Sequence, residues 1–244
     1  MAKNLIKIKK KKILILGASS DIGIKVVQQF LNKNWAVLAH SNKNKRKLSL
    51  IKNKDLSIFK LDLSNPIKVE KYIKKNLITF RKIDSFVSLT GFLKLSSYEN
   101  FKIKDFYLHL NINYLANQFF IRQIIKYMKK KKWGRILISS SIGTKFGGNK
   151  NTYLYSLSKH MNEFFPSIFK NLAKYNILYN CMQIGVTDTK LNRIDKNKNI
   201  HKRAKLIPLK RIAKPEEIAK YIYFIGSDEN TFTTLQNIKV TGGE

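Results

Sequence analysis

The chain has 244 residues, and hydrophobic residues make up 43% of them, which excludes an intrinsically disordered protein and allows a large buried core. The formal net charge at pH 7 is +33, and a charge of this size attracts polyanions. Because the lysines are spread along the whole chain and do not form one basic arm, we expect a solvated basic surface and no nucleic-acid partner.

The N-terminal segment is basic, and it leads into the short apolar run Ile13–Leu16. This run is too short for the apolar part of a signal peptide, and no stretch of the chain reaches the length of a membrane span. Cys181 is the only cysteine, which excludes an internal disulfide and a cysteine-based zinc site. We therefore expect a cytoplasmic protein without a membrane partner.

Short apolar runs alternate with longer amphipathic ones, which is typical of βαβ units and a parallel sheet. The predicted strands are Lys12–Leu16, Ala36–Ala39, Ser57–Leu61, Ser85–Leu89, Arg135–Ser139, Ile177–Ile184 and Asn237–Val240. The main predicted helices are Ile22–Leu31, Pro66–Asn76, Asn113–Lys129, Ser156–Lys174 and Pro215–Ile225. Without an internal repeat or a flexible linker, the pattern predicts one α/β domain over residues 1–244, with a doubly wound, Rossmann-like sheet.

Two segments read as loops that follow strands. Thr144–Asn151 is rich in glycine, asparagine and lysine, and Asp188–Pro208 is strongly basic with weak periodicity. In doubly wound sheets, ligands bind beyond the carboxyl ends of the strands. We therefore expect both segments to cover an active site.

The segment Gly17-Ala18-Ser19-Ser20-Asp21-Ile22-Gly23 lies directly after the first predicted strand. Glycines there permit a tight turn, and the free N–H groups at the start of the next helix can hold a pyrophosphate. The alternative is an ordinary turn between a strand and a helix. The position between the first strand and the first helix favours dinucleotide binding.

This segment resembles the glycine motif of the short-chain dehydrogenases/reductases, and the resemblance extends over nearly the whole chain. It implies an oxidoreductase that binds a nicotinamide dinucleotide through the glycine segment and through segments after the third, fourth and sixth strands. The residues that it implies as cofactor contacts there are Gly17, Ser19, Ser20, Ile22, Gly23, Asp62, Leu63, Thr90, Gly91, Gly185, Val186, Thr187 and Thr189.

The chain departs from the family pattern at several positions. Leu16 stands where a threonine is common, and Asp21 replaces the middle glycine, where an acid at the first helical turn suits the helix dipole. Ser88-Leu89-Thr90-Gly91 stands where the family has Asn-Asn-Ala-Gly, which could loosen the support of the fourth strand. Ile184 stands in place of a proline.

Cofactor preference depends on the end of the second strand, where an acid would bind the ribose 2′-hydroxyl of NAD and repel a 2′-phosphate. The sequence there is His40-Ser41-Asn42, which we take as further cofactor contacts, and no acid is present. Lys43, Lys45 and Arg46 follow and could pair with a 2′-phosphate. We therefore expect NADP(H), with NAD(H) as the alternative.

The family signature Tyr-x-x-x-Lys occurs three times, as Tyr98/Lys102, Tyr127/Lys131 and Tyr155/Lys159. Since lysine is abundant, the pattern alone selects none of them. Only Tyr155 follows a serine-rich strand end and a glycine-rich loop, and only there does a helix place the lysine one turn from the tyrosine. Tyr155 and Lys159 are therefore the predicted catalytic pair, which would also contact the cofactor. The alternative is a structural pair on a helix.

The resemblance implies roles for four residues. Tyr155 would give a proton to the forming alkoxide, and the Lys159 ammonium would lower its pKa from the reference value of about 10. Ser141 would orient the substrate oxygen, with Ser140 as the alternative. Asn113 would support a water-linked proton path, with Asn111 as the alternative.

The sequence thus predicts an NADP(H)-dependent enzyme that interconverts a carbonyl and a secondary alcohol. Narrower alternatives are a reductase of carrier-protein-bound 3-oxoacyl chains and a reductase of sugar-linked substrates. A basic nucleic-acid-binding protein that keeps the fold is a further alternative, but it would have no reason to keep the catalytic residues in order. The histidines have no metal-ligand spacing, so we expect no metal site.

The resemblance also implies a homotetramer in which Asn113–Lys129 and Ser156–Lys174 pair across subunits. The first helix carries Phe119, Ile121, Ile124 and Ile125, and the second carries Phe164, Phe165, Ile168 and Phe169. These apolar residues exceed what one face against a sheet requires, so we expect a partner subunit to bury some of them.

Overall fold

The chain folds around a seven-stranded parallel sheet, in a computed structural model that describes residues 10–42, 45–196 and 199–244. The strand order is β3-β2-β1-β4-β5-β6-β7, and every neighbouring pair is parallel. The strands are β1 Lys12–Leu16, β2 Ala36–Ser41, β3 Leu56–Lys60, β4 Ser85–Ser88, β5 Gly134–Ser141, β6 Ile177–Ile184 and β7 Asn237–Val240. This is the predicted doubly wound, Rossmann-like fold.

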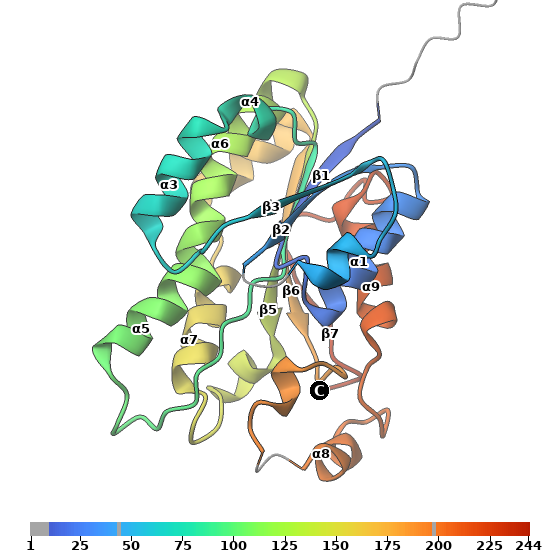
Figure 1. Cartoon of the computed structure of the whole chain (residues 1–244). Coiled ribbons are helices and arrows are strands. Elements are labelled where there is room, and N and C mark those ends of the chain that lie inside the picture. The colour runs from blue at the N-terminus through green and yellow to red at the C-terminus, as the bar shows by residue number, and fades with distance from the viewer. Residues whose placement is uncertain (1–9, 43–44, 197–198) are drawn as a thin grey trace, which may run out of the picture.

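Helices cover both faces of the sheet (Figure 1). The α-helices are α1 Asp21–Asn32, α2 Arg46–Ser49, α3 Pro66–Lys75, α4 Leu77–Phe80, α5 Ile103–Leu110, α6 Ala116–Lys131, α7 Tyr153–His160, α8 Ile200–Leu206 and α9 Pro215–Gly226. Buried residues of α3, α4 and α6 form the core on one face, and those of α1 and α9 form the core on the other. None of the helices in these described ranges is long and apolar enough to span a lipid bilayer.

β1 shows why the sheet needs two cores. Ile13 and Ile15 point into the core beneath α1 and α9, whereas Leu14 and Leu16 point into the core beneath α3 and α6. All four side chains are fully buried. Successive residues of a strand face opposite sides, so a strand covered on both faces reads as a continuous apolar run.

The predicted strand bounds agree closely with the structure, and β1, β6 and β7 agree at both ends. The main difference lies in β5, which pairs with β6 as far as Ser141 instead of ending at Ser139. The serines of this segment are therefore part of the sheet, so their side chains alternate between its two faces.

Two predicted helices are not continuous. Asn113–Lys129 is the later part of a longer helical segment that begins with α5, widens into the π-helical turn η1 (Asn111–Leu115) and continues as α6. Ser156–Lys174 is divided, because α7 ends at His160 and an extended stretch precedes the 3₁₀ helix η4 (Ser167–Tyr175). Pro166 explains the division, since it has no N–H to donate and disfavours helical geometry at the residue before it.

Candidate active site

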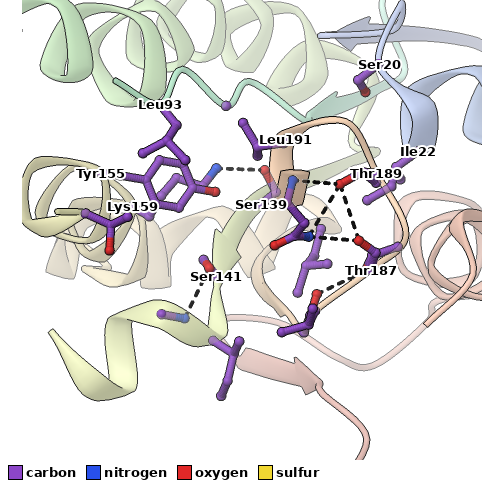
Figure 2. Close-up of a pocket in the computed structure, with 18 of the residues that line it drawn as sticks. Ser20, Ile22, Leu93, Ser139, Ser141, Tyr155, Lys159, Thr187, Thr189 and Leu191 are labelled. Atoms are coloured by element: carbon purple, nitrogen blue, oxygen red, sulfur yellow. Dashed lines mark hydrogen bonds between the residues drawn. The ribbon is translucent and has the colours of Figure 1, made fainter. Parts of the chain in front are cut away.

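A cavity of about 640 Å³ opens at the carboxyl ends of the strands. The glycine turn after β1, the ends of β4, β5 and β6, and the start of α7 line it. Figure 2 shows Ser20 and Ile22 on one side and Tyr155 and Lys159 on the other. This is the edge of the sheet at which doubly wound folds bind ligands.

The glycine turn requires its glycines. Gly17 has φ +71°, and a Cβ atom on it would lie 2.8 Å from the backbone oxygen of Leu89. A Cβ atom on Gly23 would lie 2.5 Å from the backbone oxygen of Gly17. Ser20 caps α1 by accepting a hydrogen bond from the N–H of Gly23 at 3.0 Å. The turn therefore presents the N-terminus of α1 to the cavity, as pyrophosphate binding requires.

His40 supports this turn from behind. Its Nδ1 accepts a hydrogen bond from the N–H of Gly17 at 3.2 Å, so the proton is on Nε2, which donates to the backbone oxygen of Leu61 at 2.8 Å. Burial lowers the pKa of His40 below its ordinary value, which keeps the ring neutral. His40 does not line the cavity. Its two hydrogen bonds fix the glycine turn to the end of β3.

The end of β2 is uncharged and is followed by basic residues. Ser41 is buried and its hydroxyl has no hydrogen-bond partner among the described residues, whereas Asn42 is exposed. Lys45 and Arg46 are exposed, and Lys43 lies outside the described residues.

Lys47, which the sequence analysis missed, lines the cavity and pairs with Asp21 at 2.8 Å. Asp21 also accepts a hydrogen bond from the N–H of Lys190 at 2.8 Å, so it joins the glycine turn to the loop after β6.

The predicted cofactor contacts after β3 do not line the cavity, whereas those after β4 do. Asp62 is exposed and accepts a hydrogen bond from the N–H of Ser64 at 2.9 Å, while Leu63 is buried in the core, and neither lines the cavity. Thr90 and Gly91 do line it.

The altered segment at the end of β4 is well supported. Ser88 Oγ donates to Asn117 Oδ1 at 2.6 Å and lies 3.1 Å from Thr90 Oγ1. An amide supplied by α6 therefore braces the fourth strand, in contrast to the loosening that the sequence suggested.

The loop after β6 forms another wall, with Gly185, Val186, Thr187 and Thr189 all facing the cavity. Thr187 Oγ1 donates to the backbone oxygen of Gly185 at 2.9 Å, which fixes the turn. Figure 2 shows Thr187 and Thr189 on this wall.

Tyr155 and Lys159 come from α7 and lie beside the end of β5 (Figure 2). Lys159 Nζ donates to the backbone oxygen of Thr90 at 2.9 Å and to Ser139 Oγ at 3.0 Å. The Tyr155 hydroxyl interacts with the Ser141 side chain, which opposes the rise in the pKa of Tyr155. The predicted pair thus meets the predicted serine in the cavity. Ser139 is an additional site residue that the run of serines could have suggested.

The two titratable side chains have pKa values that are shifted in opposite directions. Burial raises the pKa of Tyr155 to about 12, although the hydrogen bond with Ser141 opposes this. Burial lowers the pKa of Lys159 to about 8, while negative charge at Cys181 and Glu163 would raise it. At neutral pH the phenol therefore keeps its proton, and most of the lysine is charged. That is the state from which a phenol can donate a proton.

The three serines of β5 have different partners. Ser141 faces Tyr155 and also accepts a hydrogen bond from the N–H of Gly143 at 3.1 Å. Ser140, the alternative from the sequence, donates to Glu163 Oε1 at 2.5 Å. The geometry therefore favours Ser141 as the group that would contact a substrate oxygen.

Asn113 lies in the π-helical turn η1, behind the cavity wall. Its side chain exchanges hydrogen bonds with the N–H of Phe92 at 2.7 Å and the oxygen of Phe92 at 3.0 Å, and it donates to Ser158 Oγ at 2.9 Å. Its backbone oxygen accepts the amides of Asn117 and Asn162 at 2.9 and 3.0 Å.

Asn113 therefore ties the loop after β4 to α7. Its role in a water-linked proton path stays a prediction. Asn111, the alternative, donates instead to the backbone oxygen of Ser64 at 2.9 Å.

The cavity has the features that a nicotinamide dinucleotide needs. The glycine turn allows close approach to a helix N-terminus, and Ser19, Ser20 and Ile22 line the cavity there. Tyr155 and Lys159 lie at the other end, where a reactive ring would meet a substrate. No cluster of metal-binding side chains occurs in the described part of the chain.

Comparison with known proteins gives one family. A family model described as Enoyl-(Acyl carrier protein) reductase matches residues 17–244. A 3-oxoacyl-[acyl-carrier-protein] reductase FabG from Rickettsia felis is 30% identical over 238 residues, which cover 94% of this chain and 95% of that protein. An L-rhamnose 1-dehydrogenase (NADP(+)) from Thermoplasma acidophilum is 30% identical over 188 residues, which cover 75% of this chain and 74% of that protein.

Among solved structures, that of an ElxO variant with NADPH bound superimposes with a TM-score of 0.83 at 26% identity, over 96% of this chain and 98% of that one. The fold, the cavity at the strand ends and these similarities all indicate the same family. The chain belongs to the short-chain dehydrogenase/reductase family of NAD(P)-dependent oxidoreductases.

Proposed function

We propose that this chain, acting as one dinucleotide-binding domain, is an NADP(H)-dependent enzyme that interconverts a carbonyl and a secondary alcohol. The observation that carries the proposal is the cluster of Tyr155, Ser141 and Lys159 at the cofactor cavity. Tyr155 and Ser141 both line the cavity and interact with each other, and the Lys159 ammonium lies on the same helix one turn away. A phenol, a hydroxyl and a buried cation are the groups that carbonyl reduction requires.

When bound, a nicotinamide cofactor would supply a hydride to the carbonyl carbon of the substrate. Ser141 donates a hydrogen bond to the carbonyl oxygen and orients it, and Tyr155 transfers its proton to that oxygen as the C=O double bond becomes a C–O single bond. The positive charge of Lys159 stabilises the phenolate that remains. In the reverse direction the same phenolate accepts the proton of the alcohol.

Three observations support NADP(H) over NAD(H). The end of β2 has no carboxylate, and Lys45 and Arg46 follow it on the surface. The Thermoplasma acidophilum relative is named for NADP(+), and the structure of the ElxO variant contains NADPH. NAD(H) is the alternative.

Two substrate classes follow from the relatives. One is a 3-oxoacyl chain on a carrier protein, as in the reductase from Rickettsia felis, and the other is a sugar, as in the L-rhamnose dehydrogenase. Lys190, an exposed basic side chain that lines the cavity, suits a substrate that carries a phosphate or lies on an acidic protein. This observation favours the carrier-bound substrate.

The test measures binding before turnover. Quenching of tryptophan fluorescence by NADPH and by NADH gives two dissociation constants, and we expect the NADPH value to be the lower one. NADPH oxidation with acetoacetyl thioesters and NADP⁺ reduction with L-rhamnose then separate the substrate classes. Failure to bind either cofactor would contradict the proposed function.

A further inference from the structure

The turn after α7 brings a carboxylate behind the end of β5. The 3₁₀ turn η3 (Met161–Glu163) follows α7 directly, and Phe164 then takes an extended conformation. The side chain of Glu163 is only 9% exposed and does not line the cavity. A buried carboxylate needs partners, because its desolvation is costly.

Those partners belong to the active-site strand and to the loop after it. Glu163 Oε1 accepts hydrogen bonds from Ser140 Oγ at 2.5 Å and from Thr144 Oγ1 at 2.7 Å. Thr144 Oγ1 also lies 2.8 Å from the backbone oxygen of Ser141. An ionised carboxylate can only accept, so both hydroxyls turn toward it in short, charge-assisted bonds.

This arrangement determines which serine meets the substrate. Because neighbouring residues of a strand face opposite sides, holding Ser140 against Glu163 turns Ser141 toward Tyr155. Ser140 Oγ also lies 3.2 Å from the backbone oxygen of Lys159, so the same hydroxyl joins the strand to the catalytic helix.

The groups around Glu163 come from three elements. From α7, His160 Nδ1 lies 3.2 Å from Oε2, and Lys159 interacts with Glu163 electrostatically. From β6, the Cys181 thiol interacts with Lys159 and with Glu163. Burial raises the pKa of Cys181 to about 12, so the thiol is neutral near pH 7. From β7, the uncharged Asn237 amide donates to the backbone oxygen of Glu163 at 3.2 Å. The Glu163 carboxylate is thus the negative charge that raises the pKa of Lys159.

We propose that Glu163 is a positioning residue of this active site: it holds Ser140 and Thr144 so that Ser141 faces Tyr155, and its negative charge acts on Lys159. The inference rests on the proposed reductase function and adds a residue that touches neither the cofactor cavity nor a substrate.

The decisive variant is Glu163→Gln, which keeps the volume and an acceptor oxygen but removes the charge. We expect kcat to fall about tenfold, less than the hundredfold that a misplacement of about 1 Å costs. The dissociation constant for NADPH should stay the same. The alkaline limb of the pH profile of kcat should move to lower pH, because Lys159 loses its proton more easily without the carboxylate. A lower kcat with an unmoved pH profile would mean a merely structural role and would overturn the proposal.

Two variants serve as controls. Asp84→Asn removes a carboxylate that accepts from the N–H of Lys12 at 2.6 Å, at the opposite edge of the sheet, and should lower stability without moving the pH profile. Ser140→Ala keeps the Glu163 charge but removes the hydroxyl, so it should lower kcat and leave the alkaline limb in place. If Glu163→Gln does not fold by circular dichroism, a wild-type kcat in Ser140→Ala would overturn the proposal.

A second readout does not depend on turnover. The fall in unfolding midpoint caused by Glu163→Gln should be larger at pH 7 than at pH 9.5, because Lys159, with its pKa of about 8, is charged only at the lower pH. An equal fall at both pH values would contradict the charge role. A wild-type protein that oxidises no NADPH would instead contradict the proposed function, and the unfolding midpoints would still decide the role of Glu163.

Discussion

At the level of single side chains, the site depends on two groups whose pKa values burial shifts in opposite directions. Burial makes the Tyr155 phenol harder to ionise and the Lys159 amine easier to deprotonate. Both shifts favour the neutral forms, so the proposed catalysis needs a negative group near Lys159 and a hydrogen bond on Tyr155. Ser141 supplies the hydrogen bond, and Glu163 supplies the charge.

Tyr155→Phe should abolish most of the hydride transfer while leaving NADPH binding nearly unchanged, because the ring still packs and only the proton donor is lost. We expect kcat to fall by about 10²–10⁴-fold, the usual contribution of an acid/base group. Steady-state kinetics and fluorescence titration measure the two effects. Tyr98→Phe and Tyr127→Phe, which alter tyrosines outside the cavity, should behave like the wild type. Turnover retained in Tyr155→Phe would show that another tyrosine acts.

Ser41→Asp should shift cofactor preference toward NADH, because a carboxylate at the end of β2 accepts from a ribose hydroxyl and repels a 2′-phosphate. We expect the ratio of the NADPH and NADH affinities to fall at least tenfold, as about 1.4 kcal/mol would produce. Ser41→Asn is the matched control of similar size without the charge. Tighter binding of NADH than of NADPH by the unmodified protein would contradict the preference itself.

At the level of elements, the cavity is built where regular structure ends or changes. The glycine turn is held by His40, the π-helical turn carries Asn113, and α7 stops before Glu163. A π-helical turn inside a helix is often found at a functional site, because the extra residue redirects side chains. In this chain it directs Asn113 toward Phe92 and Ser158.

Acidification should weaken the glycine turn. Burial lowers the pKa of both His40 and His109, so below about pH 6.5 the unfolded chain takes up protons that the folded chain does not. Their contribution to stability is therefore complete above that pH and falls as the pH decreases toward the folded pKa values. Urea denaturation at pH 7.5 and 5.5 should show a lower free energy of unfolding at pH 5.5.

His40→Asn should reduce this pH dependence, with His109 accounting for the rest. It should also cost about 1–3 kcal/mol at pH 7.5, because the N–H of Gly17 or the oxygen of Leu61 loses its buried partner. A pH dependence as steep as that of the wild type would refute the assignment to His40.

For the whole molecule, the large positive charge of each subunit opposes assembly. Of the apolar residues expected to face a partner subunit, Ile121 and Ile124 are buried in the protein's own core. Phe119, Ile125, Phe165 and Phe169 pack partly against the same core. Phe164 and Ile168 remain 70% and 65% exposed, on the segment where the predicted helix is divided.

We still expect a homotetramer at about 0.15 M salt, where charges are screened over about 8 Å and apolar burial contributes about 25 cal/mol per Å². Sedimentation velocity should show this species, and smaller species at about 0.01 M salt, where the screening length grows to about 30 Å and the subunits repel more strongly. Phe164→Ser combined with Ile168→Ser should weaken the assembly. A monomer at micromolar concentration in about 0.15 M salt would contradict the expectation.

The amino-acid sequence by itself determined the sheet and the position of the proposed catalytic pair. Strands buried on both faces read as short apolar runs, which is why β1, β6 and β7 were predicted with the observed bounds. Tyr155 and Lys159 were identified because their context, a strand end, a glycine-rich loop and one helical turn, is local in the chain.

Only the tertiary structure decided which groups support that pair. Ser139 meets Lys159, Ser140 meets Glu163 and Ser88 meets Asn117 across 20, 23 and 29 residues of chain, respectively. The π-helical turn also left no trace in the hydrophobic periodicity, because one extra residue hardly changes a 3.6-residue repeat. Hydrophobic patterning reports which faces are buried, whereas a hydrogen bond between distant side chains depends on the register and helix packing that burial produces.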